Sequence, residues 1–147
     1  MKITICGSIA FYEEMRKTKK DLEFLGHIVE MPPGEITAGD GKVMPVMEYY
    51  QVRQTATPTD AWIWDRKEEA IKRHFEKVAG ADAILVLNHD KKGIVGYIGA
   101  NTLMEMGLAL HLGKRIYLLN QIPEISYREE ILGMKPKVIN GDFAQIV

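Results

Sequence analysis

The sequence lacks the features that would tie it to an oxidising compartment or to a membrane. It contains one cysteine, Cys6, so no disulfide framework can form within the chain, and a reducing compartment is the natural expectation. No apolar run approaches the length of a membrane span, and Met1-Lys2 leads into an apolar segment without a signal-peptide pattern. We therefore expect a cytoplasmic protein with no membrane partner.

An excess of charge of one sign is also missing. The 147 residues carry a formal net charge of −1, and the 19 basic and 20 acidic side chains are interspersed along the chain. No stretch forms a Lys/Arg patch, so a nucleic acid polymer is not an expected partner. The length and the 46% hydrophobic content fit one globular domain over residues 1–147.

Short apolar segments alternate with helical patterns along the chain. Strands are predicted at residues 2–6, 27–31, 83–87, 116–119 and 137–139, and helices at about 11–25, 59–79, 101–113 and 126–132. This alternation predicts an α/β fold, flavodoxin-like or Rossmann-like, in which a five-stranded parallel sheet lies between helices and the first and third strands are adjacent. Residues 34–61 are broken by glycine and proline, and we interpret them as an insertion that covers the sheet edge or forms a lid, with a short helix within 43–53. Lys67 falls mainly on the outer side of its helix.

The chain is organised around residues 94–113, where a loop containing Gly99 runs from the third strand into a helix that opens at Asn101 or Thr102. This order of strand, glycine loop and helix N-terminus builds ligand sites in open parallel sheets. Glu105 is expected in the first helical turn. It either completes a capping box with Thr102 or acts as a carboxylate nucleophile, whose ionised form the helix dipole favours.

Two further loops are expected at the same edge of the sheet. The first βα turn contains Gly7 and Ser8, whose backbone amides and hydroxyl could accept an anion or sugar hydroxyls, or whose glycine only serves the turn. Asn88, His89 and Asp90 follow the third strand, where they form either part of a ligand site or a solvated turn. Both loops should converge on the start of the Glu105 helix.

Several motifs resemble the nucleoside 2-deoxyribosyltransferase family, which includes the 2′-deoxynucleoside 5′-phosphate N-hydrolases. The resemblance rests on Ile5-Cys6-Gly7-Ser8-Ile9, Gly80-Ala81-Asp82-Ala83-Ile84-Leu85-Val86 and Met104-Glu105-Met106-Gly107-Leu108-Ala109. It covers most of the chain except residues 34–61. It implies cleavage or exchange of the N-glycosidic bond of a nucleoside or nucleotide, through a covalent glycosyl ester on Glu105 and without a metal or organic cofactor.

The resemblance also implies roles for the surrounding residues. Asp90, with Asn88 and His89 as neighbours, would supply a proton or hydrogen bonds to the leaving base. The sugar and its 5′ side would be bound by residues of the first βα turn and of the Gly99 loop with the helix start that follows it, namely Gly7, Ser8, Ile9, Gly99, Asn101 and Thr102. A homo-oligomer, dimeric or larger, is expected, because the family usually completes its pocket across a subunit interface.

The chain departs from the family pattern at three places. Thr4 and Ile5 stand in the first strand where many members carry a tyrosine. Ile9-Ala10-Phe11 stands where the nucleotide hydrolases usually have an arginine and glycines, and His74 stands where many members carry an aspartate. His74 either meets the base or only packs on its helix. Because a fold does not fix an activity, a nucleotide-binding or sensing module without turnover is the alternative function.

Overall fold

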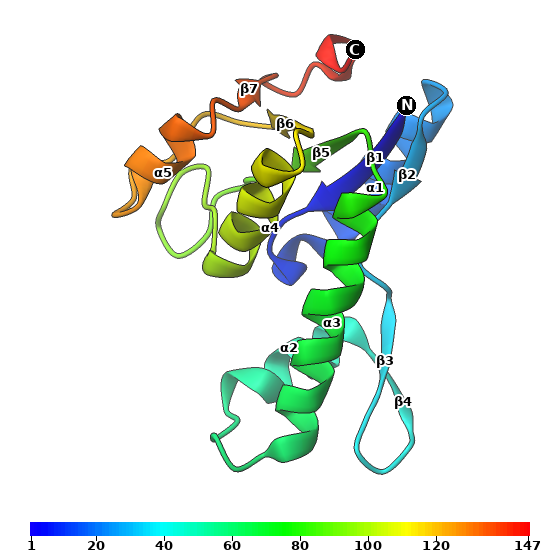
Figure 1. Cartoon of the computed structure of the whole chain (residues 1–147). Coiled ribbons are helices and arrows are strands. Elements are labelled where there is room, and N and C mark those ends of the chain that lie inside the picture. Colours follow the sequence, from blue (N-terminus) through cyan, green and yellow to red (C-terminus); the bar gives the residue numbers. More distant parts are fainter.

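A five-stranded parallel sheet in the order β2-β1-β5-β6-β7 forms the centre of the protein (Figure 1). This computed structural model describes residues 1–147. The strands are β1 (Lys2–Cys6), β2 (Ile28–Glu30), β5 (Ala83–Val86), β6 (Arg115–Leu118) and β7 (Lys137–Val138). The predicted fold is confirmed, including the adjacent first and third strands: β1 pairs with β5, and Cys6 lies opposite Val86.

Helices cover both faces of this sheet. The helices of the chain are α1 (Tyr12–Phe24), α2 (Val46–Gln54), α3 (Ala61–Ala79), α4 (Ala100–His111) and α5 (Arg128–Gly133), with short 3-10 helices η1 (Ile9–Phe11) and η2 (Phe143–Gln145), and of these α2 lies beyond the sheet. None of them combines the length and apolar character needed to span a bilayer.

Alternation along the strands divides the core into two clusters. Ile3, Ile5 and Leu85 pack on one face with Met15 of α1. The opposite face carries a second cluster that includes Cys6, Ile84, Val86, Met106 of α4 and Val78 of α3. Cys6 therefore points towards the side of the sheet on which α3 and α4 lie.

Residues 34–61 form a hairpin and a helix that extend away from the sheet alongside the first half of α3 (Figure 1). Strands β3 (Glu35–Thr37) and β4 (Val43–Pro45) are antiparallel, and α2 follows directly. The helix predicted within 43–53 begins only at Val46, because the three residues before it are paired in the hairpin. The Tyr49 hydroxyl donates a 2.8 Å hydrogen bond to the Ile63 carbonyl, which ties α2 to α3.

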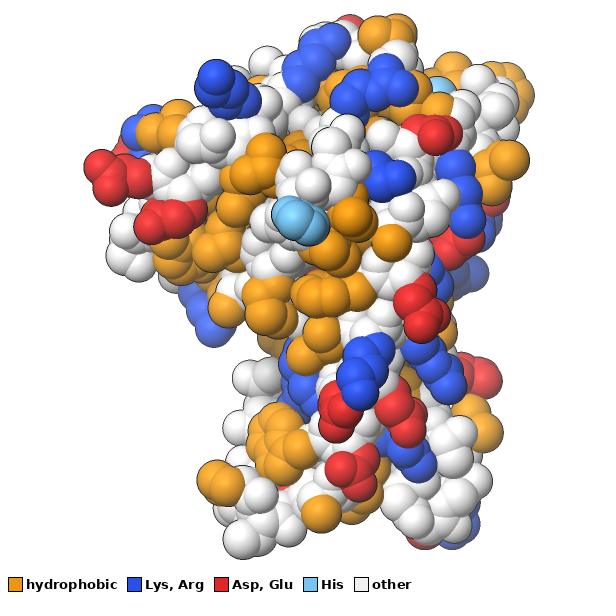
Figure 2. Space-filling view, in the orientation of Figure 1, with side chains coloured by type: hydrophobic (Ala, Val, Ile, Leu, Met, Phe, Trp, Pro, Cys, Tyr) orange, Lys and Arg blue, Asp and Glu red, His pale blue; other side chains and the backbone are white.

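Apolar side chains remain exposed on the outer side of α4. Met104, Leu110 and Leu112 have 46%, 51% and 41% of their surface accessible, and Val95 in the preceding loop has 69%. Figure 2 shows apolar side chains gathered over this helix. We refer to these four residues as the α4 apolar patch.

Candidate active site

A cavity of about 840 Å³ opens between the carboxyl edge of the sheet and residues 34–61. Its lining comes from the first βα turn, the start of α4, the cavity side of α3, and α2 with the β3–β4 hairpin. The sequence-predicted residues that line it are Gly7, Ser8, Ile9, His74, Gly99, Asn101, Thr102 and Glu105. Both loops that were expected to converge line the same cavity as Glu105: the first βα turn does so through Gly7, Ser8 and Ile9, and the loop after β5 through Lys91, Lys92, Tyr97 and Gly99.

Glu105 lies in the second turn of α4, and only 3% of its surface is exposed. The expected first-turn position and capping box are both wrong: the helix begins at Ala100 with Gly99 as its N-cap, so Thr102 is already inside the helix. The Glu105 Oε1 atom accepts a 2.9 Å hydrogen bond from Asn101 Nδ2, whereas Oε2 is buried without a partner.

Burial, rather than the helix dipole, dominates the ionisation of Glu105. Removal from water raises its pKa from 4.5 to about 7, although the Cys6 thiol and the Lys67 ammonium oppose the rise. At pH 7 the carboxyl group is therefore about half ionised. The sequence analysis expected a stabilised anion because it placed Glu105 at the end of the helix.

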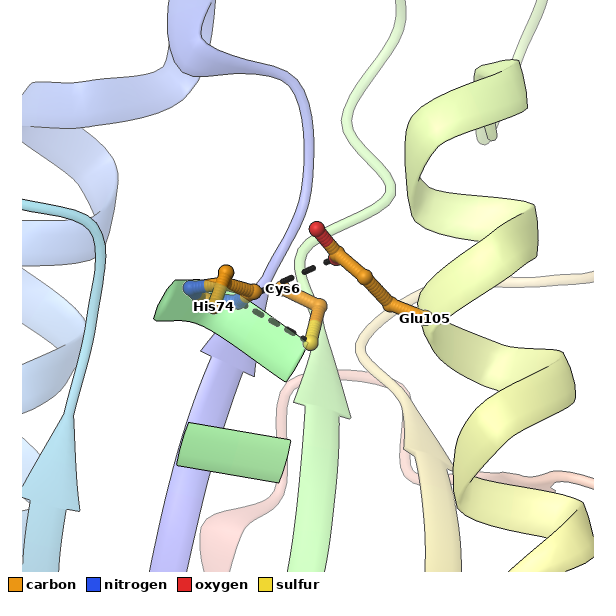
Figure 3. Close-up of side chains that lie close together, drawn as sticks. All are labelled: Cys6, His74 and Glu105. Atoms are coloured by element: carbon orange, nitrogen blue, oxygen red, sulfur yellow. Dashed lines mark hydrogen bonds and ion pairs between the residues drawn. The ribbon is translucent and has the colours of Figure 1, made fainter. Parts of the chain in front are cut away.

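Cys6 and His74 complete a buried cluster with Glu105 (Figure 3). His74 Nε2 lies 3.5 Å from Cys6 Sγ and 3.8 Å from Glu105 Oε2. Burial, with the charge of Lys77 as a smaller cause, lowers the pKa of His74 to about 4, so the imidazole is neutral at pH 7. The contact between His74 and Glu105 is therefore not an ion pair at that pH.

Lys67 is a cavity residue that sequence reasoning assigned to the outer side of its helix. Its Nζ atom donates a 3.3 Å hydrogen bond to Asn101 Oδ1, and burial together with the charge of Arg53 lowers its pKa to about 8. The first half of α3 runs beyond the sheet and faces α2, so its polar side lines the cavity instead of meeting bulk water. The amphipathic pattern of α3 does not reveal that Lys67 faces a cavity, because the packing of α2 against α3 cannot be recognised from the sequence.

Ser8 marks a second polar group of the cavity. Its hydroxyl oxygen accepts hydrogen bonds from Lys91 Nζ at 2.7 Å and from the Ala10 amide at 3.3 Å. Lys91 Nζ also donates to the Tyr50 hydroxyl at 2.8 Å, and this contact lowers the pKa of the phenol. Three separate segments of the chain thus meet at one ammonium group.

The chain was compared with known protein families, sequences and structures. No family model matches the chain, and no curated protein sequence matches it. Among solved structures, a 2-deoxyribosyltransferase from the psychrotolerant bacterium Bacillus psychrosaccharolyticus aligns with a TM-score of 0.50 and 19% identity, over 80% of this chain and 71% of that one. The CMP N-glycosidase BcmB of Clostridium botulinum aligns with a TM-score of 0.46 and 17% identity, over 94% of this chain and 85% of that one.

The chain has the fold of a 2-deoxyribosyltransferase. The architecture implied by the sequence resemblance is thereby confirmed.

Three residues predicted for the site lie outside the cavity of this deoxyribosyltransferase fold. Asn88 is fully buried, and its side chain holds the backbone of Asn120 and Gln121 through bonds of 2.8 to 3.0 Å. Asp90 accepts a 3.0 Å bond from the Gly96 amide, and His89 packs edge-on against Phe11. The structure therefore gives Asn88, His89 and Asp90 a role in holding their loop and does not bring them to Glu105.

Proposed function

We propose that the protein cleaves or exchanges the N-glycosidic bond of a nucleoside or nucleoside 5′-monophosphate, with Glu105 as the nucleophile. The observation that carries the proposal is the placement of this carboxyl group at the cavity wall, with one oxygen held by Asn101 and the other without a partner. The fold shared with a 2-deoxyribosyltransferase supports the same reaction class.

The chemistry suits a free carboxylate oxygen. As the bond between the sugar C1′ and the base nitrogen breaks, its electron pair leaves with the base and positive charge develops on the sugar. The carboxylate stabilises this charge and closes on C1′ to give a glycosyl ester. Water or a second base then displaces the ester from the opposite face, so two inversions retain the configuration.

We propose that Lys67 stabilises the ionised form of Glu105. The ammonium reaches the carboxylate through Asn101, which accepts a bond from Lys67 and donates one to Glu105. Its positive charge lowers the pKa of Glu105, against the larger effect of burial. The role predicted for Asp90, a proton or hydrogen bond to the leaving base, is not part of this proposal, because Asp90 lies outside the cavity.

A 5′-monophosphate is the favoured form of the substrate. The cavity is lined by seven Lys or Arg side chains, from Arg53, Arg66, Lys67, Arg73, Lys77, Lys91 and Lys92, against the acidic Glu35, Glu69 and Glu105. We propose that the phosphate binds at Ser8, Lys91 and Tyr50, where the Lys91 ammonium lies 2.7 Å from the Ser8 hydroxyl and 2.8 Å from the Tyr50 hydroxyl. Lys91 would then replace the arginine that is missing from the first turn.

The remaining expectations are part of this proposal. Residues 34–61 supply one wall of the cavity, and we propose that they close it over the bound substrate. We propose a cytoplasmic homo-oligomer that buries the α4 apolar patch, because exposed apolar side chains so close together are typical of interfaces. Light scattering of the wild type and of Leu110→Glu would test this: an unchanged mass in the variant contradicts an interface at α4.

The central experiment supplies a panel of nucleosides and 5′-monophosphates, with and without an acceptor base, and separates the products by chromatography. Release of free base, or of a new nucleoside, establishes the reaction. Glu105→Ala should abolish it, whereas Glu76→Ala, which removes an exposed carboxylate of α3, should not. Full activity in Glu105→Ala rejects the nucleophile, and thermal stabilisation by nucleotides without any product supports the sensing module.

A further inference from the structure

Cys6, His74 and Glu105 form a cluster that the proposed reaction uses only in part. They come from the end of β1, from α3 and from α4, and all three are buried. One sulfur, one nitrogen and one oxygen atom of these side chains lie within 4.8 Å of one another (Figure 3). The family resemblance implies no metal, and it says nothing of this combination of side chains.

We propose that Cys6 Sγ, His74 Nε2 and Glu105 Oε2 bind one Zn²⁺ ion. Zinc bonds of about 2.3 Å to sulfur and about 2.0 to 2.2 Å to nitrogen and oxygen, at tetrahedral angles, separate sulfur from nitrogen by roughly 3.5 Å and nitrogen from oxygen by roughly 3.4 Å. The corresponding separations here are 3.5 Å and 3.8 Å. The sulfur and oxygen atoms lie within 4.8 Å of one another, against the roughly 3.6 Å of a zinc site, so the Cys6 and Glu105 side chains would have to move closer together to bind the ion.

The surroundings of the three atoms favour a ligand. Glu105 Oε2 is buried without a hydrogen-bond partner, which is costly unless something binds there. Asn101 holds the other oxygen at 2.9 Å, as outer-shell hydrogen bonds usually orient a metal-binding carboxylate.

The identity of the ion follows from the donor set. A thiolate, an imidazole and a carboxylate together suit zinc better than magnesium or calcium, which prefer oxygen alone. His74 and Glu105 line the cavity and Cys6 is fully buried, so an ion bound by the three side chains would lie at the cavity wall. Binding releases the Cys6 thiol proton to solvent, together with the Glu105 proton when that group is protonated.

Zinc should inhibit the proposed reaction. The ion would take the electron pair of Glu105 Oε2 that must attack C1′, so a zinc-loaded site has no nucleophile. This consequence alone rests on the proposed function, because zinc binding itself needs no substrate and is measured without one.

The test uses cobalt as a coloured substitute for zinc. The reduced, chelator-treated protein is titrated with Co²⁺, and we expect one equivalent to bind with a thiolate-to-cobalt charge-transfer band that one equivalent of Zn²⁺ removes. The band can arise only from Cys6, because the chain has no other cysteine. Cys6→Ser should abolish it and weaken zinc binding at least about tenfold, whereas the exposed His111→Asn on α4 should change neither.

Three results would overturn the proposal. One is the absence of equimolar cobalt binding to folded protein. Another is a spectrum of bound cobalt that lacks the charge-transfer band. A cobalt spectrum that disappears in His27→Asn would count in the same way, since His27 lies 3.4 Å from the terminal amine and offers an adventitious site. The third is unchanged zinc affinity in His74→Asn, which tests the site independently if Cys6→Ser fails to fold. Lack of turnover on every nucleoside would contradict the proposed function and leave these binding results unaffected.

Discussion

Asn101 Nδ2 donates a 2.9 Å hydrogen bond to Glu105 Oε1, from a position one turn earlier on the same helix. Residues four apart on a helix lie above one another, so the amide can hold the carboxylate without distortion. The same amide accepts a bond from Lys67 on its oxygen, which fixes which end of the side chain faces the glutamate. Asn101 therefore holds Oε1 and leaves the buried Oε2 facing His74, 3.8 Å from its Nε2 atom.

Asn101→Ala should slow the reaction more than it weakens substrate binding. A hydrogen bond to a charged group contributes about 1.5 to 3 kcal/mol, so we expect kcat to fall roughly 10- to 100-fold when the carboxylate loses its support. Steady-state kinetics on a reactive substrate would measure kcat and KM separately. A rise in KM at constant kcat would show that Asn101 contacts the substrate and does not position Glu105.

Glu105→Gln should change the pH dependence of stability. The pKa of Glu105 in the folded protein, about 7, exceeds its ordinary value of 4.5, so the folded state holds the proton more tightly. This contribution is fully present below about pH 4.5 and is lost as the pH rises through 7, when a buried charge must form. Between pH 5 and pH 8 the wild type should lose about 2 to 3 kcal/mol relative to Glu105→Gln.

Urea unfolding of the two proteins at several pH values, with a chelator present, would measure this difference. Glutamine keeps the size of the side chain and can still accept the Asn101 hydrogen bond, so the comparison isolates ionisation. A stability difference that stays constant from pH 5 to pH 8 would contradict a raised pKa.

Lys67→Met should move the acidic limb of the activity profile to higher pH. The ammonium lowers the pKa of Glu105, and its removal leaves burial unopposed by that charge. Because the carboxylate is the reactive form, activity near pH 6.5 should fall by about threefold to tenfold more than activity near pH 8.5. Lys72→Met removes an exposed ammonium from the same helix and should leave the profile in place. Parallel losses at every pH would assign Lys67 to substrate binding.

The sheet and its order could be predicted because the signal for each strand is local. Residues 83–86 are apolar throughout and buried on both faces, and glycines separate this strand and β1 from the helices around them. The β3–β4 hairpin left no such signal, since each strand has only three residues and Thr37 and Val43 are exposed. Pairing between the two strands, and not the pattern within either, creates the hairpin.

The site was predictable only where a motif lies within one segment. Glu105, Gly7 and Ser8 belong to short patterns that the sequence displays directly, and the structure places all three at one cavity. Lys91 belongs to the polar loop after β5 that was expected at this edge of the sheet. Lys67 enters the cavity through the packing of distant segments, so no spacing along the chain indicates it. Thr102 and Glu105 have the residue types and spacing of a capping box, but the helix begins at Ala100, so Thr102 does not stand at the cap position.

Lys91→Met should separate nucleotides from nucleosides. If the phosphate binds at Ser8, Lys91 and Tyr50, loss of the ammonium removes a charge-assisted bond to the phosphate and nothing from an unphosphorylated substrate. We expect KM for a 5′-monophosphate to rise about 10- to 100-fold and KM for the matching nucleoside to change less than about twofold.

The nucleoside serves as the internal control for folding and for Glu105, since both substrates need the same carboxylate. Lys114→Met, which removes an ammonium that does not line the cavity, should leave both values unchanged. Equal losses for the nucleotide and the nucleoside would mean that Lys91 supports the loop or the base. The phosphate would then have to bind among the other cationic side chains of the cavity, and Arg53→Met would be the next variant to compare.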